Sequence, residues 1–234
     1  GIDPFVRVSW DQANQIVAAE LDRVIAAHGN EAIYAGSYGW ASAGRFHHAP
    51  GQLHRFLNAL GGYTKSVNTY SFAAAEVIVP HVIGHFRNYI YNQTSWASVR
   101  DHCQLFVAFG GVALKNGQIG QGGLGRHIQK ESILEAHKNG VEFISVSPLR
   151  SDMIDDVDAA WLSIRPNSDA ALMIGLCQVL FDEGLHDRAF LDRYCVGFDK
   201  FADYLTGASD GIVKDAAWAG EICAMDAEAI RALA

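Results

Sequence analysis

The sequence predicts an α/β fold, in which a parallel sheet carries helices on both of its faces. Three continuous apolar runs of strand length, 104–109, 141–146 and 160–164, alternate with segments of helical periodicity. Continuous apolar runs are typical of parallel strands buried on both faces, and their alternation with helices is typical of crossover connections. In such sheets ligands bind beyond the carboxyl ends of the strands, so a site is expected there.

The first part of the chain carries helix and strand signals with clear ends. Ser9 and Gln12 form a capping-box pattern ahead of apolar residues at helical spacing, and Gly29 ends that helix. A short strand is predicted over 32–35 and a second amphipathic helix over 50–60. These elements lead into the more regular second half.

The second half contains the predicted sheet and its helices. A helix over 126–138 separates the first two strands. Asn167, Ser168 and Asp169 form an N-cap cluster for a long helix that ends at Gly184. Three loops follow the strand ends: 110–125, 147–152 and 165–169.

The composition argues against two kinds of partner. The 234 residues carry 18 Lys and Arg against 26 Asp and Glu, a formal net charge of -8. Phosphate backbones are bound by clustered basic side chains, so no nucleic-acid partner is expected. The most apolar stretch, 72–83, is too short to span a membrane and is broken by Glu76 and Pro80, so no membrane span is expected either.

The cysteines and histidines do not form a recognisable metal motif. The four cysteines show no C-x-x-C spacing and predict neither a zinc or iron–sulfur site nor a disulfide framework. His81 and His85 are four apart and would share one helix face, but no third ligand accompanies them. Hydrogen-bonded histidines on a partly buried helix are the preferred interpretation.

Two glycine-rich patterns match known motifs only in part. Gly120-x-Gly122-x-x-Gly125 has the letters of a dinucleotide fingerprint, but no strand ends immediately before it. The segment 39–44 is one residue too long for a nucleophile elbow. The aromatic loop 37–40 after the first short strand either packs into the core or lines a site.

Short segments in order along the chain carry a family resemblance. They are 36–40 (GSYGW), 45–49 (RFHHA), 57–62 (LNALGG), 70–75 (YSFAAA), 80–84 (PHVIG), 109–111 (FGG), 114–117 (LKNG), 147–150 (SPLR) and 165–169 (RPNSD). Together they resemble the dimethyl sulfoxide, trimethylamine N-oxide and biotin sulfoxide reductase family of molybdenum enzymes. The residues of segments 45–49 and 109–117 most resemble those of the biotin sulfoxide and N-oxide reductase branch.

The resemblance implies a molybdenum bis(molybdopterin guanine dinucleotide) cofactor with a serine ligand to the metal. Ser71, which composition alone marks as a helix cap, stands at that position. Tyr38 and Trp40 match residues that face the labile oxygen of the metal, and Trp40 also matches a cofactor contact. Residues 1–100 would then form the active-site segment and 101–234 a Rossmann-like guanine-dinucleotide-binding segment.

The resemblance also assigns cofactor contacts to the loops at the strand ends. The matching residues are Lys115, Asn116, Ser147, Pro148, Asn167 and Asp169. The family often has Asn where Ser147 stands and other residues where Asn167 and Ser168 stand. Asp169 is therefore the best supported of these contacts.

The implied activity is oxygen-atom transfer from an S-oxide or N-oxide. The substrate stays open among biotin sulfoxide, methionine sulfoxide, dimethyl sulfoxide and an N-oxide. The implied partners are an electron-donor protein or reduced nicotinamide and the remainder of a longer polypeptide. The implied location is the bacterial cytoplasm or periplasm, and this chain alone is expected to be inactive.

Two alternatives remain open from the sequence. Another molybdopterin oxidoreductase, such as a formate dehydrogenase or nitrate reductase, usually places Cys, selenocysteine or Asp at the metal, and Ser71 argues against it. A non-catalytic nucleotide-binding fragment is the second alternative, because further pterin contacts are expected from the rest of the polypeptide.

Overall fold

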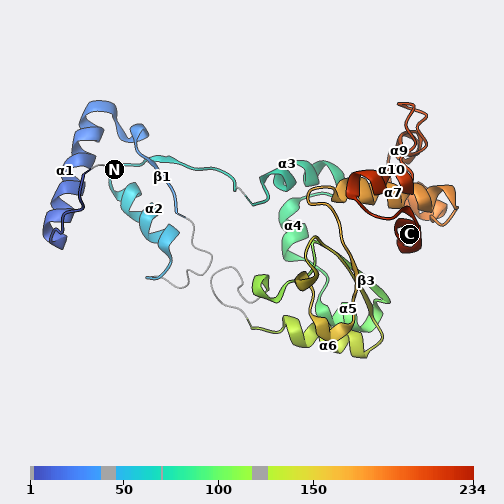
Figure 1. Ribbon diagram of the computed structural model, residues 1–234. Coiled ribbons are helices and arrows are strands. Elements are labelled where there is room, and N and C mark those ends of the chain that lie inside the picture. The colour runs from blue at the N-terminus through green and yellow to red at the C-terminus, as the bar shows by residue number, and fades with distance from the viewer. Residues whose placement is uncertain (1–2, 38–45, 70, 118–125) are drawn as a thin grey trace. The chain divides into compact units, whose positions relative to one another are not determined.

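The computed structural model describes residues 3–37, 46–69, 71–117 and 126–234 (Figure 1). The chain divides into two compact units. The first unit comprises Gly1–Gln93 and Ile119–Arg126, and the second comprises Thr94–Gln118 and His127–Ala234.

The first unit begins with helix α1 (Trp10–His28), and the predicted capping box is confirmed. The Ser9 hydroxyl accepts a hydrogen bond from the backbone N–H of Gln12 at 3.2 Å, while the Gln12 side chain accepts one from the Ser9 backbone at 3.0 Å. Gly29 ends the helix with a φ of 79°, as predicted. No residue of α1 is fully buried, and its cap satisfies backbone groups that the first turn leaves without a partner.

The predicted strand over 32–35 is shorter in the structure. The segment Asn30–Ala32 forms a 3₁₀ turn instead, because the Ile33 N–H donates to the Asn30 carbonyl at 3.1 Å. Strand β1 (Tyr34–Ala35) follows and pairs in parallel with β2 (Thr64–Lys65). The other helices of this unit are α2 (Ala49–Ala59), which confirms the second predicted helix, α3 (Ala73–Val82) and α4 (Phe86–Tyr91).

His81 and His85 do not share a helix face, so that prediction is wrong. Helix α3 contains Pro80, which cannot donate a backbone hydrogen bond, and it ends at Val82. His85 instead caps α4, where its ring Nδ1 accepts from the Arg87 N–H at 3.2 Å. Within the described ranges no group of three or more His, Cys, Asp or Glu could hold a metal ion.

The second unit is built on a three-stranded parallel sheet, which confirms the predicted sheet type. The strands are β3 (Leu105–Phe109), β4 (Glu142–Val146) and β5 (Ala160–Leu162), in the order β3-β4-β5. Ser145 in the central strand pairs with Ala108 on one side and Trp161 on the other. All three carboxyl ends therefore lie at one edge of the sheet.

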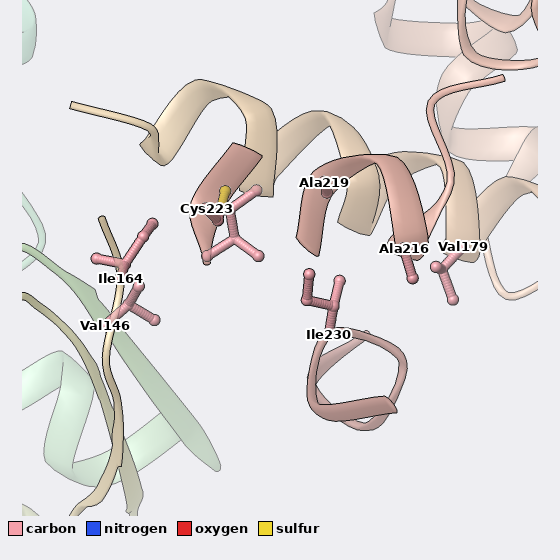
Figure 2. Packing of buried hydrophobic residues seen from close by; sticks show 8 residues of the cluster. Val146, Ile164, Val179, Ala216, Ala219, Cys223 and Ile230 are labelled. Atoms are coloured by element: carbon pink, nitrogen blue, oxygen red, sulfur yellow. The ribbon is translucent and has the colours of Figure 1, made fainter. Parts of the chain in front are cut away.

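Helices cover both faces of this sheet, as predicted. On one face Ile133 and Ala136 of helix α6 (Gln129–Lys138) pack with Phe143 of β4. On the other face Val146 of β4 belongs to a cluster with the helices α7 (Asp169–Asp182), α10 (Ala216–Cys223) and α11 (Ala227–Leu233). Figure 2 shows Val146 and Ile164 on the strand side of this cluster and Ala216, Ala219 and Cys223 on α10. The remaining helices are α5 (Trp96–His102), α8 (Arg188–Tyr194) and α9 (Phe198–Leu205).

The described helices include none with the length and apolar character needed to cross a membrane. Helix α1, the longest described helix, has 19 residues and contains the charged residues Asp11, Glu20, Asp22 and Arg23. A membrane-spanning helix needs about 20 apolar residues.

Lys214 is a buried cation that closes the turn between α9 and α10. Its side chain is 3% exposed, and Nζ donates to the two Asp210 carboxylate oxygens at 2.8 and 2.7 Å. Nζ also donates to the carbonyls of Tyr204 and Ile212 and lies 4.2 Å from the centre of the Tyr204 ring. The hydrogen bond from Lys214 lowers the pKa of Asp210 below its ordinary value.

The Asp210–Lys214 pair is expected to make stability depend on acid pH. A carboxyl whose folded pKa is lowered adds stability above its unfolded pKa, near about 3.9, and this stability is lost as the pH falls through the folded pKa. Asp210→Asn should therefore destabilise the protein at pH 7, and its deficit against the parent should shrink below about pH 4. Urea denaturation at several pH values measures this deficit, with Asp203→Asn on the exposed face of α9 as the control. An equal deficit at pH 7 and pH 3 would contradict the assignment.

Candidate functional site

The loop after β3 carries an exposed cation and an exposed amide. The Gly110 N–H donates to the Val146 carbonyl at 2.8 Å, so this loop starts against the end of β4. A 3₁₀ turn, Leu114–Asn116, then presents Lys115 and Asn116. The Lys115 side chain is 71% exposed, and its Nζ lies 4.0 Å from Asp152 Oδ1.

The loop after β4 is held by the buried Ser147. Its Oγ donates to Asp152 Oδ2 at 2.6 Å and accepts from the Leu149 N–H at 3.3 Å. Its carbonyl accepts a hydrogen bond from Trp161 Nε1 at 2.8 Å. Both the hydroxyl and the carbonyl of Ser147 are thus engaged within the protein, whereas Pro148 beside it is exposed.

The loop after β5 leads into the N-terminus of α7. Asn167 has a φ of 66°, a left-handed conformation that Asn tolerates better than most residues. Ser168 is at the N-cap, which confirms the predicted place of the helix start, but its hydroxyl donates to the Arg165 carbonyl at 2.6 Å and does not cap the helix. Asp169 begins the helix. The first amides of α7 therefore have no side-chain cap among the described residues, and such amides favour a negatively charged ligand group.

A cavity of about 200 Å³ adjoins the end of β4 and the following loop. Its lining includes Ser145, Arg150, Asp155, Asp158 and Trp161. Ser145 is 1% exposed, and its hydroxyl has no hydrogen-bond partner in the described part of the chain. A buried polar group without a partner costs about 1 to 3 kcal/mol.

A second cavity in this unit is apolar and contains none of the predicted site residues. It has about 380 Å³ and is lined by parts of α7, α8 and α9, including Cys177, His186 and Cys195. Burial raises the pKa of the Cys177 thiol, which keeps it in the unreactive protonated form. The four cysteines are free thiols.

In the first unit Ser71 lies in the turn that precedes α3. The N-cap of α3 is Phe72, so the interpretation of Ser71 as a helix cap is wrong. The Ser71 N–H donates to Thr69 Oγ1 at 3.4 Å, while its own hydroxyl is exposed and has no partner among the described residues. A cavity of about 290 Å³ is lined by Tyr34 and residues 65–69. The last of these lining residues, Thr69, is two positions before Ser71 in the chain.

Tyr38 and Trp40 lie outside the described residues, as do the segment 39–44 and the Gly120–Gly125 pattern. Of the three residues predicted at the metal, Ser71 alone has a described position. Among the predicted cofactor residues, Lys115 and Ser147 meet at a common neighbour, Asp152, which the sequence did not single out. No spacing or residue pattern marks Asp152, because its contacts form only when the sheet brings two loops together.

The fold and these loops define the class of the protein. It is an α/β protein with a parallel sheet, whose carboxyl edge presents an exposed cation, an amide and an uncapped helix N-terminus. The sequence profile of the molybdopterin oxidoreductases matches residues 1–225, so the chain belongs to the molybdopterin oxidoreductase family.

Similar proteins from bacteria confirm the resemblance drawn from the sequence. A biotin sulfoxide reductase of Cereibacter sphaeroides is 46% identical over 234 residues, which are all of this chain and 32% of that protein. A dimethyl sulfoxide/trimethylamine N-oxide reductase of the same organism is 42% identical over the same length, and a trimethylamine-N-oxide reductase of Haemophilus influenzae is 37% identical over 239 residues. The chain covers 28% of each of these two proteins, so it spans about a third or less of its relatives' length.

A solved structure confirms the fold. Acetylene hydratase from Pelobacter acetylenicus matches 97% of this chain and 28% of its own chain, with a TM-score of 0.56 and 24% sequence identity. This likeness supports a mixed α/β fold that is part of a larger architecture.

The residues present fit the molybdenum–pterin cofactor that family membership implies. Ser71 offers an exposed hydroxyl oxygen without another partner, and oxygen is a hard donor suited to a high-valent metal. The carboxyl edge of the sheet offers Lys115 and the first amides of α7 to phosphate groups.

Proposed function

We propose that the complete protein is a molybdenum-dependent reductase of S-oxides or N-oxides. The observation that carries the proposal is Ser71, whose exposed hydroxyl stands where this branch of the family has its serine ligand to the metal. Relatives named as biotin sulfoxide, dimethyl sulfoxide and trimethylamine N-oxide reductases support it. The substrate is thus a small S-oxide or N-oxide.

The proposed cofactor is the bis(molybdopterin guanine dinucleotide) form, with Ser71 as the protein ligand. When bound, the cofactor supplies two-electron oxygen-atom transfer. Residues 1–100 contribute the active-site segment and 101–234 the guanine-dinucleotide-binding segment. An electron-donor protein or reduced nicotinamide supplies the electrons, and the bacterial relatives support a bacterial cytoplasmic or periplasmic location.

Tyr38 and Trp40 act on the oxygen that leaves the substrate. This oxygen gains negative charge in the transition state, and a hydrogen bond donated by the Tyr38 hydroxyl stabilises that charge. The Trp40 indole donates its N–H in the same region and excludes water from it. Both residues lie in the active-site segment.

The strand-end loops bind one guanosine diphosphate arm. Lys115 and Asn116 donate to phosphate and ribose oxygens, and the amides at the start of α7 add further donors. The Asp169 carboxylate accepts hydrogen bonds from the N–H groups of the guanine edge. Ser147, Pro148 and Asn167 shape the loops around this arm.

Measurements of bound molybdenum and guanine nucleotide, together with a panel of S-oxide and N-oxide substrates, test this function on the full-length protein. The purified protein should contain molybdenum and release guanine nucleotide on denaturation, and it should reduce at least one S-oxide or N-oxide with a reduced viologen dye. Protein without molybdenum or guanine nucleotide would instead favour a non-catalytic nucleotide-binding role. A loaded protein that reduces none of these oxides would favour a different molybdopterin oxidoreductase.

Tyr38→Phe separates the proposed catalytic role from cofactor binding. Removing one donor to a developing negative charge lowers kcat by about 10²- to 10³-fold, so turnover should fall to this extent while the molybdenum content stays unchanged. Tyr194→Phe, at an exposed tyrosine of the second unit, is the control. Unchanged turnover in Tyr38→Phe would overturn the assigned role.

A further inference from the structure

Asp152 connects the two strand-end loops that carry four of the proposed cofactor residues. Its Oδ2 accepts the hydrogen bond from Ser147 Oγ at 2.6 Å, and its backbone carbonyl accepts from the Val112 N–H at 2.7 Å. Its Oδ1 lies 4.0 Å from Lys115 Nζ. The Asp152 side chain is 16% exposed and Ser147 is buried, so the hydrogen bond between them forms in a largely desolvated place.

We propose that Asp152 is a positioning residue for the cofactor. Its side chain holds the loop after β4 in place through Ser147 and draws Lys115 of the loop after β3 toward that loop, so that Lys115 and the backbone around Ser147 are preset to bind the nucleotide arm. Asp152 does not itself contact that arm. The inference rests on the proposed function, because the nucleotide arm belongs to the cofactor assigned there.

The hydrogen bond from Ser147 is the strong part of this arrangement. A hydroxyl that donates to a carboxylate at 2.6 Å forms a short, charge-assisted bond, and burial of Ser147 strengthens it. Ser147 has one hydroxyl proton and gives it to Asp152, so it cannot donate that proton to a ligand at the same time. Ser147 thus supports the cofactor through its backbone and its loop.

The ion pair with Lys115 is the weaker part. Because the Lys115 side chain is 71% exposed, the pair adds little to stability. Its effect is to direct Nζ toward the loop after β4, which lowers the conformational entropy that Lys115 loses when it binds a phosphate. The backbone bond from Val112 keeps the two loops together whether or not this pair is formed.

Three variants of the full-length protein test the inference. Asp152→Ala removes every side-chain contact, Asp152→Asn keeps an acceptor for Ser147 but loses the charge, and Asp156→Ala is the matched control. Asp156 is an exposed carboxylate close by in the chain, which pairs with Lys130 at 3.1 Å and makes no hydrogen bond to either strand-end loop among the described residues. Partners that orient metal ligands typically contribute about 10- to 100-fold to affinity, and we expect the lower part of that range here.

The main readout is the guanine nucleotide and molybdenum retained after dialysis well below the melting temperature. Retention should fall about 10-fold in Asp152→Ala and less in Asp152→Asn, while Asp156→Ala retains as much as the parent. Turnover per bound molybdenum should stay unchanged, because Asp152 does not reach the reacting atoms.

Each outcome separates this inference from the proposed function. If the parent retains guanine nucleotide and folded Asp152→Ala retains as much, Asp152 has no positioning role. If Asp152→Ala does not fold, Asp152→Asn decides, and full retention there overturns the inference. If the parent itself binds no guanine nucleotide, the proposed function fails and the inference falls with it.

Discussion

Ser71→Ala is expected to abolish oxide reduction by the full-length protein without changing its stability. The Ser71 hydroxyl is exposed and has no hydrogen-bond partner among the described residues, so its removal should change the free energy of unfolding by less than about 0.5 kcal/mol. If it is the metal ligand, its loss should lower turnover by more than about 100-fold, since even residues that only orient metal ligands contribute about 10- to 100-fold. Metal analysis, the visible absorption spectrum and turnover measure these effects.

Two further serine variants make this result specific. Ser209→Ala removes an exposed hydroxyl from a loop of the second unit and should leave metal content and turnover unchanged. Ser71→Cys offers a softer sulfur donor, so it should retain metal with a shifted absorption spectrum. A native spectrum and native turnover in Ser71→Ala would rule out ligation by this residue.

Gly111→Ala is expected to cause a large loss of stability for a loop substitution in the second unit. Gly111 has a φ of 74°, which costs an L-residue about 1 to 2 kcal/mol. A Cβ at this position would also lie 2.5 Å from both the Cβ and the backbone oxygen of Asp152. Overpacking of this kind typically costs a further 1 to 3 kcal/mol, and the backbone of Asp152 cannot move without breaking its bond to Val112.

Gly110→Ala is a matched control for this clash. Gly110 has a similar φ of 86°, but a Cβ there would meet nothing within 4 Å. Chemical denaturation should therefore show a loss of about 1 to 2 kcal/mol for Gly110→Ala and about 2 to 5 kcal/mol for Gly111→Ala. Equal losses in the two variants would mean that the close approach to Asp152 has no energetic effect.

Local patterns predicted those parts of the fold that local chemistry determines. Ser9, Gln12 and Gly29 predicted where α1 begins and ends, because a capping box and a terminal glycine act within a few residues. The strands were predictable because each is a continuous apolar run, and such runs are typical of a parallel sheet covered by helices on both faces. His81 and His85 were wrongly predicted to share a helix face. A spacing of four residues does not show where a helix ends, and α3 ends at Val82, before His85.

The site was less predictable because its contacts depend on residues far apart in sequence. Nothing in the type of Ser71 distinguishes it from other serines, and only the resemblance of the surrounding segments assigned it a role. Asp152 was not predicted, because its partner Val112 lies in a loop after a different strand. The N-cap cluster 167–169 correctly predicted where α7 begins, but it did not show that the Ser168 hydroxyl donates to the Arg165 carbonyl three residues earlier.

The three-stranded sheet also has a consequence for how the protein is handled. Because the described order is β3-β4-β5, one side of β3 and one side of β5 present backbone groups that no described strand pairs. Leu105 and Trp161 on these outer strands are partly exposed as well. Unpaired apolar edges of this kind promote strand-to-strand association between molecules. Self-association of the isolated chain would therefore reflect these open edges, and it would say nothing about the oligomeric state of the complete protein.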